Sequence, residues 1–144
     1  ADLTMILNGA LAGLVAITAQ PVSPSAPLAA VIGAIAGVLV VISIIALDKL
    51  KLDDPVGALS VHGVCGLFGL LMVPISDSSA SLAVQAAAAA TIFVWMFGSS
   101  LVIWWLLHKL IGIRVSAEQE YQGADTVDCG IDAYPEFVRG ASSR

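Results

Sequence analysis

His62 is the most informative candidate for chemistry, because it lies inside a long apolar segment. No other Asp, Glu, Lys, Arg or His occurs between Pro55 and Ser76. Ionisable side chains inside a membrane are costly, and they usually face a bundle interior or a water-accessible path. The low dielectric penalises the imidazolium, so we expect a neutral ring that donates from one nitrogen and accepts at the other. Such a ring suits a polar wall or relay for a small permeant; the alternative is a neutral imidazole that bonds to a neighbouring helix.

Asp54 and Pro55 are expected to open the helix that carries His62. An aspartate at the cap satisfies free amides, and a proline at the first helical position needs no amide donor. We therefore predict that Asp54 is a structural helix cap at the membrane interface. Counted from Asp54, His62 lies roughly 12 Å along a helix, near the middle of a roughly 30 Å hydrocarbon core. Ala58, one turn before His62, leaves space in a path that leads inward.

Polar and aromatic residues elsewhere have simpler interpretations. Asn8 either caps the first helix or bonds to a partner helix. His108 and Lys109 form a cationic helix end beside the lipid headgroups, and Trp104 and Trp105 fit an interfacial aromatic belt just above them. These residues are therefore predicted to anchor and pack the helices.

The sequence has no signature of an enzyme or of a metal site. It lacks H-E-x-x-H, G-x-S-x-G and a phosphate-binding loop. Cys65 and Cys129 have no second Cys or His at metal-ligand spacing, and we interpret both as free thiols. We therefore expect no catalytic residue, no metal and no cofactor, and the lack of a basic surface argues against nucleic acid as a partner.

The composition points to the lipid bilayer as the solvent. The chain is 58% hydrophobic and 12% charged, whereas soluble domains are about 45–50% apolar and about 25% charged. No Asp, Glu, Lys or Arg occurs between Asp2 and Asp48, or between Asp77 and Lys109. Each uncharged run exceeds the roughly 20 residues that one membrane span requires. The sequence therefore predicts an all-α, polytopic membrane helical bundle.

Prolines and charges divide residues 1–113 into four predicted spans. Pro21, Pro24 and Pro27 break the first apolar run, the charged stretch DKLKLDDP follows the second, and a turn at 74–79 follows the third. The predicted spans are about 3–20, 27–47, 55–73 and 82–112. The last span of about 31 residues would be roughly 46 Å long, so it must tilt or protrude from a roughly 30 Å core.

The distribution of Lys and Arg predicts the orientation. Lys49 and Lys51 lie in the second connector, and Lys109 and Arg114 lie at the end of the last span. Cytoplasmic loops carry an excess of these residues. We therefore expect a multi-pass membrane protein whose second connector and tail, residues 114–144, are cytoplasmic.

Glycines recur at spacings that predict close contact between helices. Residues three or four apart share one face of a helix, and small residues there let backbones approach. The sets are Gly9 and Gly13, Gly33 and Gly37, and Gly63, Gly66 and Gly69. They indicate a tightly packed bundle.

Three segments together resemble the ammonium transporter (Amt/Rh) family. They are NGALAGLVAIT at 8–18, DDPVGALSVHGVCG at 53–66, and GIRVSAEQEYQGAD at 112–125 followed by DAY at 132–134. They occur in the family's order and span nearly all of the chain. The sequence departs from the family at Cys129-Gly130-Ile131, where many relatives have His-Gly-Glu, and in the short connector at 74–81.

The resemblance implies a homotrimer of eleven-span subunits for nitrogen uptake, of which this chain would form the last four spans. Each subunit of that family has a narrow hydrophobic pore, in which ammonium is deprotonated and conducted past two hydrogen-bonded histidines. His62 matches the second histidine, Asp54 matches a structural aspartate, and the first histidine belongs to upstream spans. The tail resembles a regulatory tail that couples subunits and helps a PII signal protein to dock.

Two other functions are open at this stage. A membrane ammonium sensor would use the same pore to drive movement of the tail, and an appended signalling domain would favour it. An inactive fragment would need the missing spans, and an in-frame upstream sequence with the partner histidine would argue for a transporter instead.

Overall fold

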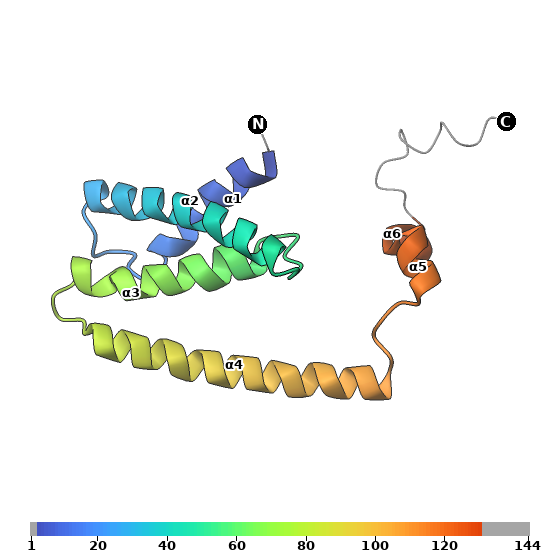
Figure 1. The fold of residues 1–144 in the computed structure, drawn as a ribbon. Coiled ribbons are helices and arrows are strands. Elements are labelled where there is room, and N and C mark those ends of the chain that lie inside the picture. Colours follow the sequence, from blue (N-terminus) through green and yellow to red (C-terminus); the bar gives the residue numbers. More distant parts are fainter. Residues whose placement is uncertain (1–2, 131–144) are drawn as a thin grey trace. The chain divides into compact units, whose positions relative to one another are not determined.

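The computed structural model describes residues 3–130, which form helices joined by turns (Figure 1). In chain order these are α1 (Leu3–Ile17), α2 (Ala26–Lys49), the π-helix η1 (Ala58–Cys65), α3 (Gly66–Ser76), α4 (Leu82–Leu110), α5 (Ala117–Gln122) and α6 (Ala124–Cys129). No strand occurs among these described residues. The predicted all-helical fold is thereby confirmed, and the chain divides into two compact units at Met96, within α4.

Three helical segments are long and apolar enough to cross a membrane. They are α2, the continuous pair η1–α3 (Ala58–Ser76), and α4. The helix α1 is apolar but has 15 residues, so it is about 22 Å long against a hydrocarbon core of about 30 Å. The chain is therefore a multi-pass membrane protein, while a fourth span and an equivalence to the last four of eleven spans stay predictions.

Two helix ends differ from the sequence-based boundaries. The helix α1 ends at Ile17, because the amides of Thr18 and Gln20 turn back to carbonyls of the preceding residues and Pro21 disfavours the helical conformation just before it. In contrast, α3 continues through Pro74 to Ser76. Pro74 has no amide donor, so one helical hydrogen bond is absent at this position, and the helix ends two residues later.

The helices α1 and α2 meet through their glycines. A Cβ atom built on Gly13 would lie 3.5 Å from Gly33 Cα, and one built on Gly37 would lie 3.9 Å from Gly9 O. Backbone therefore faces backbone along this contact, as expected of membrane helices that pack through small residues.

The contact between α3 and α1 is closer still. A Cβ atom on Gly69 would lie 2.7 Å from the carbonyl carbon of Ala16 and 2.8 Å from its Cα. Because these are backbone atoms, no side-chain rotation could relieve the overlap. Only glycine fits at position 69 without a shift of one helix against the other.

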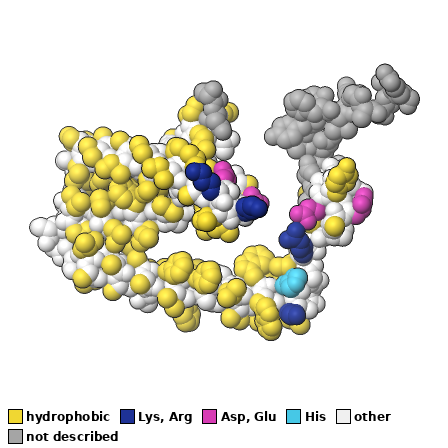
Figure 2. All heavy atoms as spheres, viewed as in Figure 1, with side chains coloured by type: hydrophobic (Ala, Val, Ile, Leu, Met, Phe, Trp, Pro, Cys, Tyr) yellow, Lys and Arg dark blue, Asp and Glu magenta, His cyan; other side chains and the backbone are white. Residues whose placement is uncertain are grey.

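The core of this three-helix unit, which comprises α1, α2 and η1–α3, is built mostly from small side chains. Its buried members are Ala12, Ala16, Ile32, Ala36, Val40, Val61 and Cys65. Larger apolar side chains such as Leu7, Ile35 and Leu67 are exposed, and hydrophobic atoms cover much of the visible face of the unit (Figure 2). Small residues inside and large apolar residues outside are typical of a bundle that lipid or further helices surround.

Candidate functional site

A tight turn precedes the helix that carries His62. Residues Asp54 to Gly57 form this turn, and the Gly57 amide donates to the Asp54 carbonyl oxygen at 3.2 Å. Pro55 occupies the second position, which its fixed φ suits. Gly57 closes the turn with φ +73°, in the left-handed region where glycine is favoured. The helix consequently begins at Ala58, so the sequence-based start at Pro55 was wrong.

The carboxylate of Asp54 reaches past the turn to the first helical residues. Its Oδ1 accepts from the Leu59 amide at 3.0 Å, and its Oδ2 accepts from the Ser60 amide at 2.9 Å and from Ser60 Oγ at 2.7 Å. Gly57 occupies the cap position but has no side chain to accept these amides. Asp54 supplies the missing acceptor from three residues upstream.

These hydrogen bonds also favour the ionised form of Asp54. Partial burial raises the pKa of its carboxyl group, but the backbone and hydroxyl donors of Leu59 and Ser60 lower it further, so the pKa lies below its ordinary value. Hydrogen bonds to the charged form favour that form. Asp54 is therefore a carboxylate at neutral pH.

His62 lies in the first turns of the π-helix η1. Its amide donates to Gly57 O at 3.4 Å, five residues back, and the Val61 amide donates to the same oxygen at 2.9 Å. Turns with five-residue hydrogen bonds are rare and occur often at functional sites. Because the residues from Asp54 to Gly57 are not helical, the expected rise of eight helical residues between Asp54 and His62 was also wrong.

His62 faces away from the core of the three-helix unit. Ser60, Val61 and Cys65 are fully buried, whereas Ala58 and His62 are exposed. Cys65 Sγ donates to the Ala36 carbonyl oxygen of α2 at 3.6 Å, which ties the opposite side of η1 to the bundle. The imidazole and Ala58 therefore share the open side of η1.

Sequence reasoning missed two residues of this site, Gly57 and Ser60. Gly57 lies against Asn8 of α1, since a Cβ atom on Gly57 would lie 3.2 Å from Asn8 Oδ1 and 2.8 Å from Val61 Cγ2. Asn8 is buried, which agrees with a contact to a neighbouring helix. The Asp-Pro-x-Gly order is a turn signature, and it was the available signal for a turn at this position.

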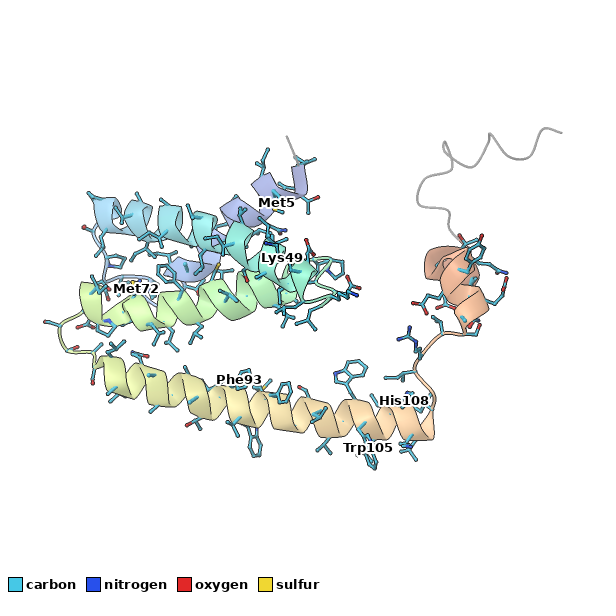
Figure 3. The ribbon with its side chains drawn as sticks, in the orientation of Figure 1. Met5, Lys49, Met72, Phe93, Trp105 and His108 are labelled. Carbon is cyan, nitrogen blue, oxygen red and sulfur yellow. The ribbon has the colours of Figure 1, made fainter. Side chains whose placement is uncertain are left out.

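The two ends of the three-helix unit differ in charge. Lys and Asp side chains gather where α2 leads into η1 (Figure 2), at the end marked by Lys49 in Figure 3. Near the other end, Ser76 Oγ donates to Gln20 Oε1, and the buried Gln20 Nε2 lacks a partner within the described residues. The charged end contains the second connector, which the positions of Lys49 and Lys51 in the sequence predict to be cytoplasmic.

The remaining sequence candidates belong to other elements of the chain. Trp105 and His108 lie in the last turns of α4 (Figure 3), and both side chains are exposed. Cys129 is a free, exposed thiol. Among the described residues no group of three His, Cys, Asp or Glu side chains could hold a metal ion.

The described part of the tail has a defined local structure. Ser116 Oγ accepts from the Gln119 amide, and Gln119 Oε1 accepts from the Ser116 amide, which forms a capping box at the start of α5. Arg114 forms an ion pair with Glu120 at 2.9 Å. The segment DAY and the end of the divergent Cys129-Gly130-Ile131 segment lie outside the described residues.

Comparison with known proteins places the chain in a family. The sequence model described as the Ammonium Transporter Family matches residues 1–134. The chain is 40% identical over 157 aligned residues to ammonium transporter Amt2 of Archaeoglobus fulgidus, which covers 95% of the chain and 34% of that relative. It is 34% identical to ammonium transporter Amt1 of Haloferax mediterranei, with 95% of the chain and 28% of the relative covered. It is 38% identical to ammonium transporter Amt2 of Haloferax mediterranei, with 94% of the chain and 32% of that relative covered. The chain thus spans about a third of the length of these relatives.

Proposed function

The chain belongs to the ammonium transporter family, and from this premise we propose that it builds part of a path that carries ammonium or ammonia across the plasma membrane. The observation that carries the proposal is the placement of His62. It is the one Asp, Glu, Lys, Arg or His of the apolar segment 55–76, and its side chain lies on the open side of η1 instead of in the core. Such a side chain in a membrane helix usually lines a path.

His62 acts in this proposal as a neutral imidazole in a narrow hydrophobic pore. One ring nitrogen donates a hydrogen bond and the other accepts one, so the ring replaces part of the hydration that a small permeant loses in the membrane. Ala58 lies one turn earlier on the same open side and leaves room beside the ring. The first histidine of the pair is contributed by a part of the transporter upstream of this chain.

The same premise gives the arrangement of the complete transporter. We propose that the chain forms the last four spans of an eleven-span subunit, with a cytoplasmic C-terminus. The cluster of Lys and Asp at the α2–η1 connector supports this orientation, because positive residues favour the cytoplasmic side. The helix α4 has 29 residues, none of them buried, and its mostly apolar surface suits contact with lipid or with further helices, as the proposed homotrimer requires.

A regulatory role for the tail belongs to the same proposal. The capping box at Ser116 and the Arg114–Glu120 ion pair give the segment before Gly123 a defined local shape. Tyr121 is 90% exposed on it, so an aromatic side chain is available to a neighbouring subunit or a PII signal protein. Coupling between subunits and PII docking would both use this surface.

Replacement of His62 tests the proposed path. In the complete transporter that contains this chain, His62→Ala should lower methylammonium uptake about tenfold or more, because removal of a hydrogen-bonding partner worth ~1.4 kcal/mol in the path corresponds to that factor. His108→Ala is the matched control, since it removes the same ring from the end of α4. Uptake by His62→Ala equal to that of His108→Ala, at equal membrane abundance, contradicts the proposal.

A further inference from the structure

The first turns of η1 are held by two acceptors only. The amides of Leu59 and Ser60 donate to the Asp54 carboxylate, and the amides of Val61 and His62 donate to Gly57 O. Helix amides in the first turn have no acceptor within the helix itself. The start of η1 therefore depends on where the Asp54–Gly57 turn places its carboxylate and its carbonyl.

The start of η1 combines an α-type and a π-type hydrogen bond at one carbonyl. The Gly57 carbonyl accepts from His62, five residues later, as well as from Val61. A turn closed by a five-residue hydrogen bond is wider than an α-helical turn, so each residue advances by a smaller rotation about the axis. The side on which the His62 ring projects therefore depends in part on the hydrogen bond that the His62 amide donates to this carbonyl.

The turn is anchored to the rest of the three-helix unit. Asn8 of α1 lies against Gly57, and Val61 fills the space on the other side of that glycine. Ser60 is fully buried and donates its hydroxyl hydrogen to Asp54. The carboxylate is thereby held against η1, and the turn that carries it lies against α1.

We propose that Asp54, Gly57 and Ser60 form a positioning unit that sets the rotation and the depth of the His62 ring in the conduction path; the inference rests on the role proposed for His62. Asp54 acts through His62 and not on the permeant, because its carboxylate already accepts three hydrogen bonds from Leu59 and Ser60. A pore that discriminates by size depends on the placement of its wall. The positioning unit therefore determines selectivity.

The test compares three variants of the complete transporter, Asp54→Asn, Ser60→Ala and Asp53→Asn. Asparagine at position 54 replaces an acceptor oxygen by an NH2 group that opposes one of the helix donors. Ser60→Ala removes only the hydroxyl donor and leaves both amide bonds. Asp53→Asn is the matched control, because it changes the same charge at the exposed neighbouring residue.

The readout is the ratio of ammonium to methylammonium transport, which does not depend on how many transporters are folded. Asp54→Asn should change this ratio by about threefold or more, since small displacements of a positioned group have large effects on rate. Ser60→Ala should change it in the same direction by less, and Asp53→Asn should leave it unchanged. With His62→Ala in place, Asp54→Asn should add no further change.

The outcomes separate this inference from the proposed function. If His62→Ala alters transport while Asp54→Asn and Ser60→Ala keep the parental ratio, His62 lines the path but the positioning unit does not exist. If the Asp54→Asn protein does not reach the membrane, Ser60→Ala decides, and a parental ratio in that variant also overturns the inference. If His62→Ala itself transports normally, the proposed function has failed first.

Discussion

The three-helix unit and the helix α4 have similarly apolar sequences but differ in what they bury. In the three-helix unit, Ala12, Ala36 and Val61 are fully buried, and α1, α2 and α3 approach through glycines. In α4 no residue is buried, and Trp95 and Trp104 are 74% and 60% exposed. Hydrophobicity alone therefore identifies segments suited to the bilayer. The size of the residues along each face determines which helices can pack tightly.

The largest expected contrast is between two glycines, one from each region. Gly69→Ala should destabilise the complete transporter by about 3 kcal/mol, because the new Cβ atom overlaps the backbone of Ala16 and forces α3 away from α1. Gly98→Ala in α4 should have little effect, since nothing lies within 4 Å of its Cβ position. The measurement is the thermal unfolding midpoint of each purified protein in detergent. Equal midpoints would show that the contact at Gly69 does not support the fold.

An intermediate contrast comes from two glycines with left-handed backbones. Gly57 has φ +73° and Gly112, just after α4, has φ +74°, so alanine costs about 1–2 kcal/mol at either position. Gly57→Ala adds a contact of 2.8 Å with Val61 Cγ2, whereas nothing lies within 4 Å at Gly112. Gly57→Ala should therefore lower the unfolding midpoint further than Gly112→Ala. A larger loss of stability in Gly112→Ala would show that the turn just after α4 tolerates alanine less well than the turn before η1.

The smallest expected contrast is in the acid sensitivity of two connectors. Burial raises the pKa of Asp54, yet its hydrogen bonds lower it more, so the folded pKa is depressed. A depressed pKa contributes stability that is present above the unfolded pKa and is lost as the pH falls through the folded value, below about pH 4. Asp54→Asn should thus have a lower thermal unfolding midpoint than the parent protein at pH 7. The two midpoints should converge in acid.

Asp77, which lies in the connector before α4, is the control for that titration. Hydrogen bonds from Ser79 hold its pKa below the ordinary value, but they involve only a residue two positions away. Asp77→Asn should accordingly change the midpoint less than Asp54→Asn at neutral pH. A difference between parent and Asp54→Asn that persists undiminished in acid would show that the charge of Asp54 is not what stabilises η1.

The positions of the long helices could be predicted from the sequence with small errors. The predicted 27–47 and 82–112 compare with α2 at Ala26–Lys49 and α4 at Leu82–Leu110, because uninterrupted apolar runs bounded by charges or turns leave few alternatives. The family resemblance is confirmed as well. His62 could be singled out as a candidate, because an ionisable residue is conspicuous in such a run.

The start of η1 could not be predicted in the same way. Pro55 suits the first position of a helix and also the second position of a turn, and local sequence does not choose between them. The choice depends on Gly57, whose left-handed backbone lies against Asn8, a residue of another helix. The Ser60 hydroxyl, which lies beyond the turn, then donates to the Asp54 carboxylate.

The sequence by itself determined that this protein is helical, that it belongs in a bilayer and that one histidine stands in its apolar interior segments, since these follow from composition and from the spacing of charges. Only the tertiary structure decided that Gly69 admits no side chain while Gly98 would, and that His62 projects from the open side of a π-helix. Contacts between distant residues, such as Ala16 with Gly69 and Asn8 with Gly57, set these features. Spacing along one helix cannot report them, because they arise where two backbones meet.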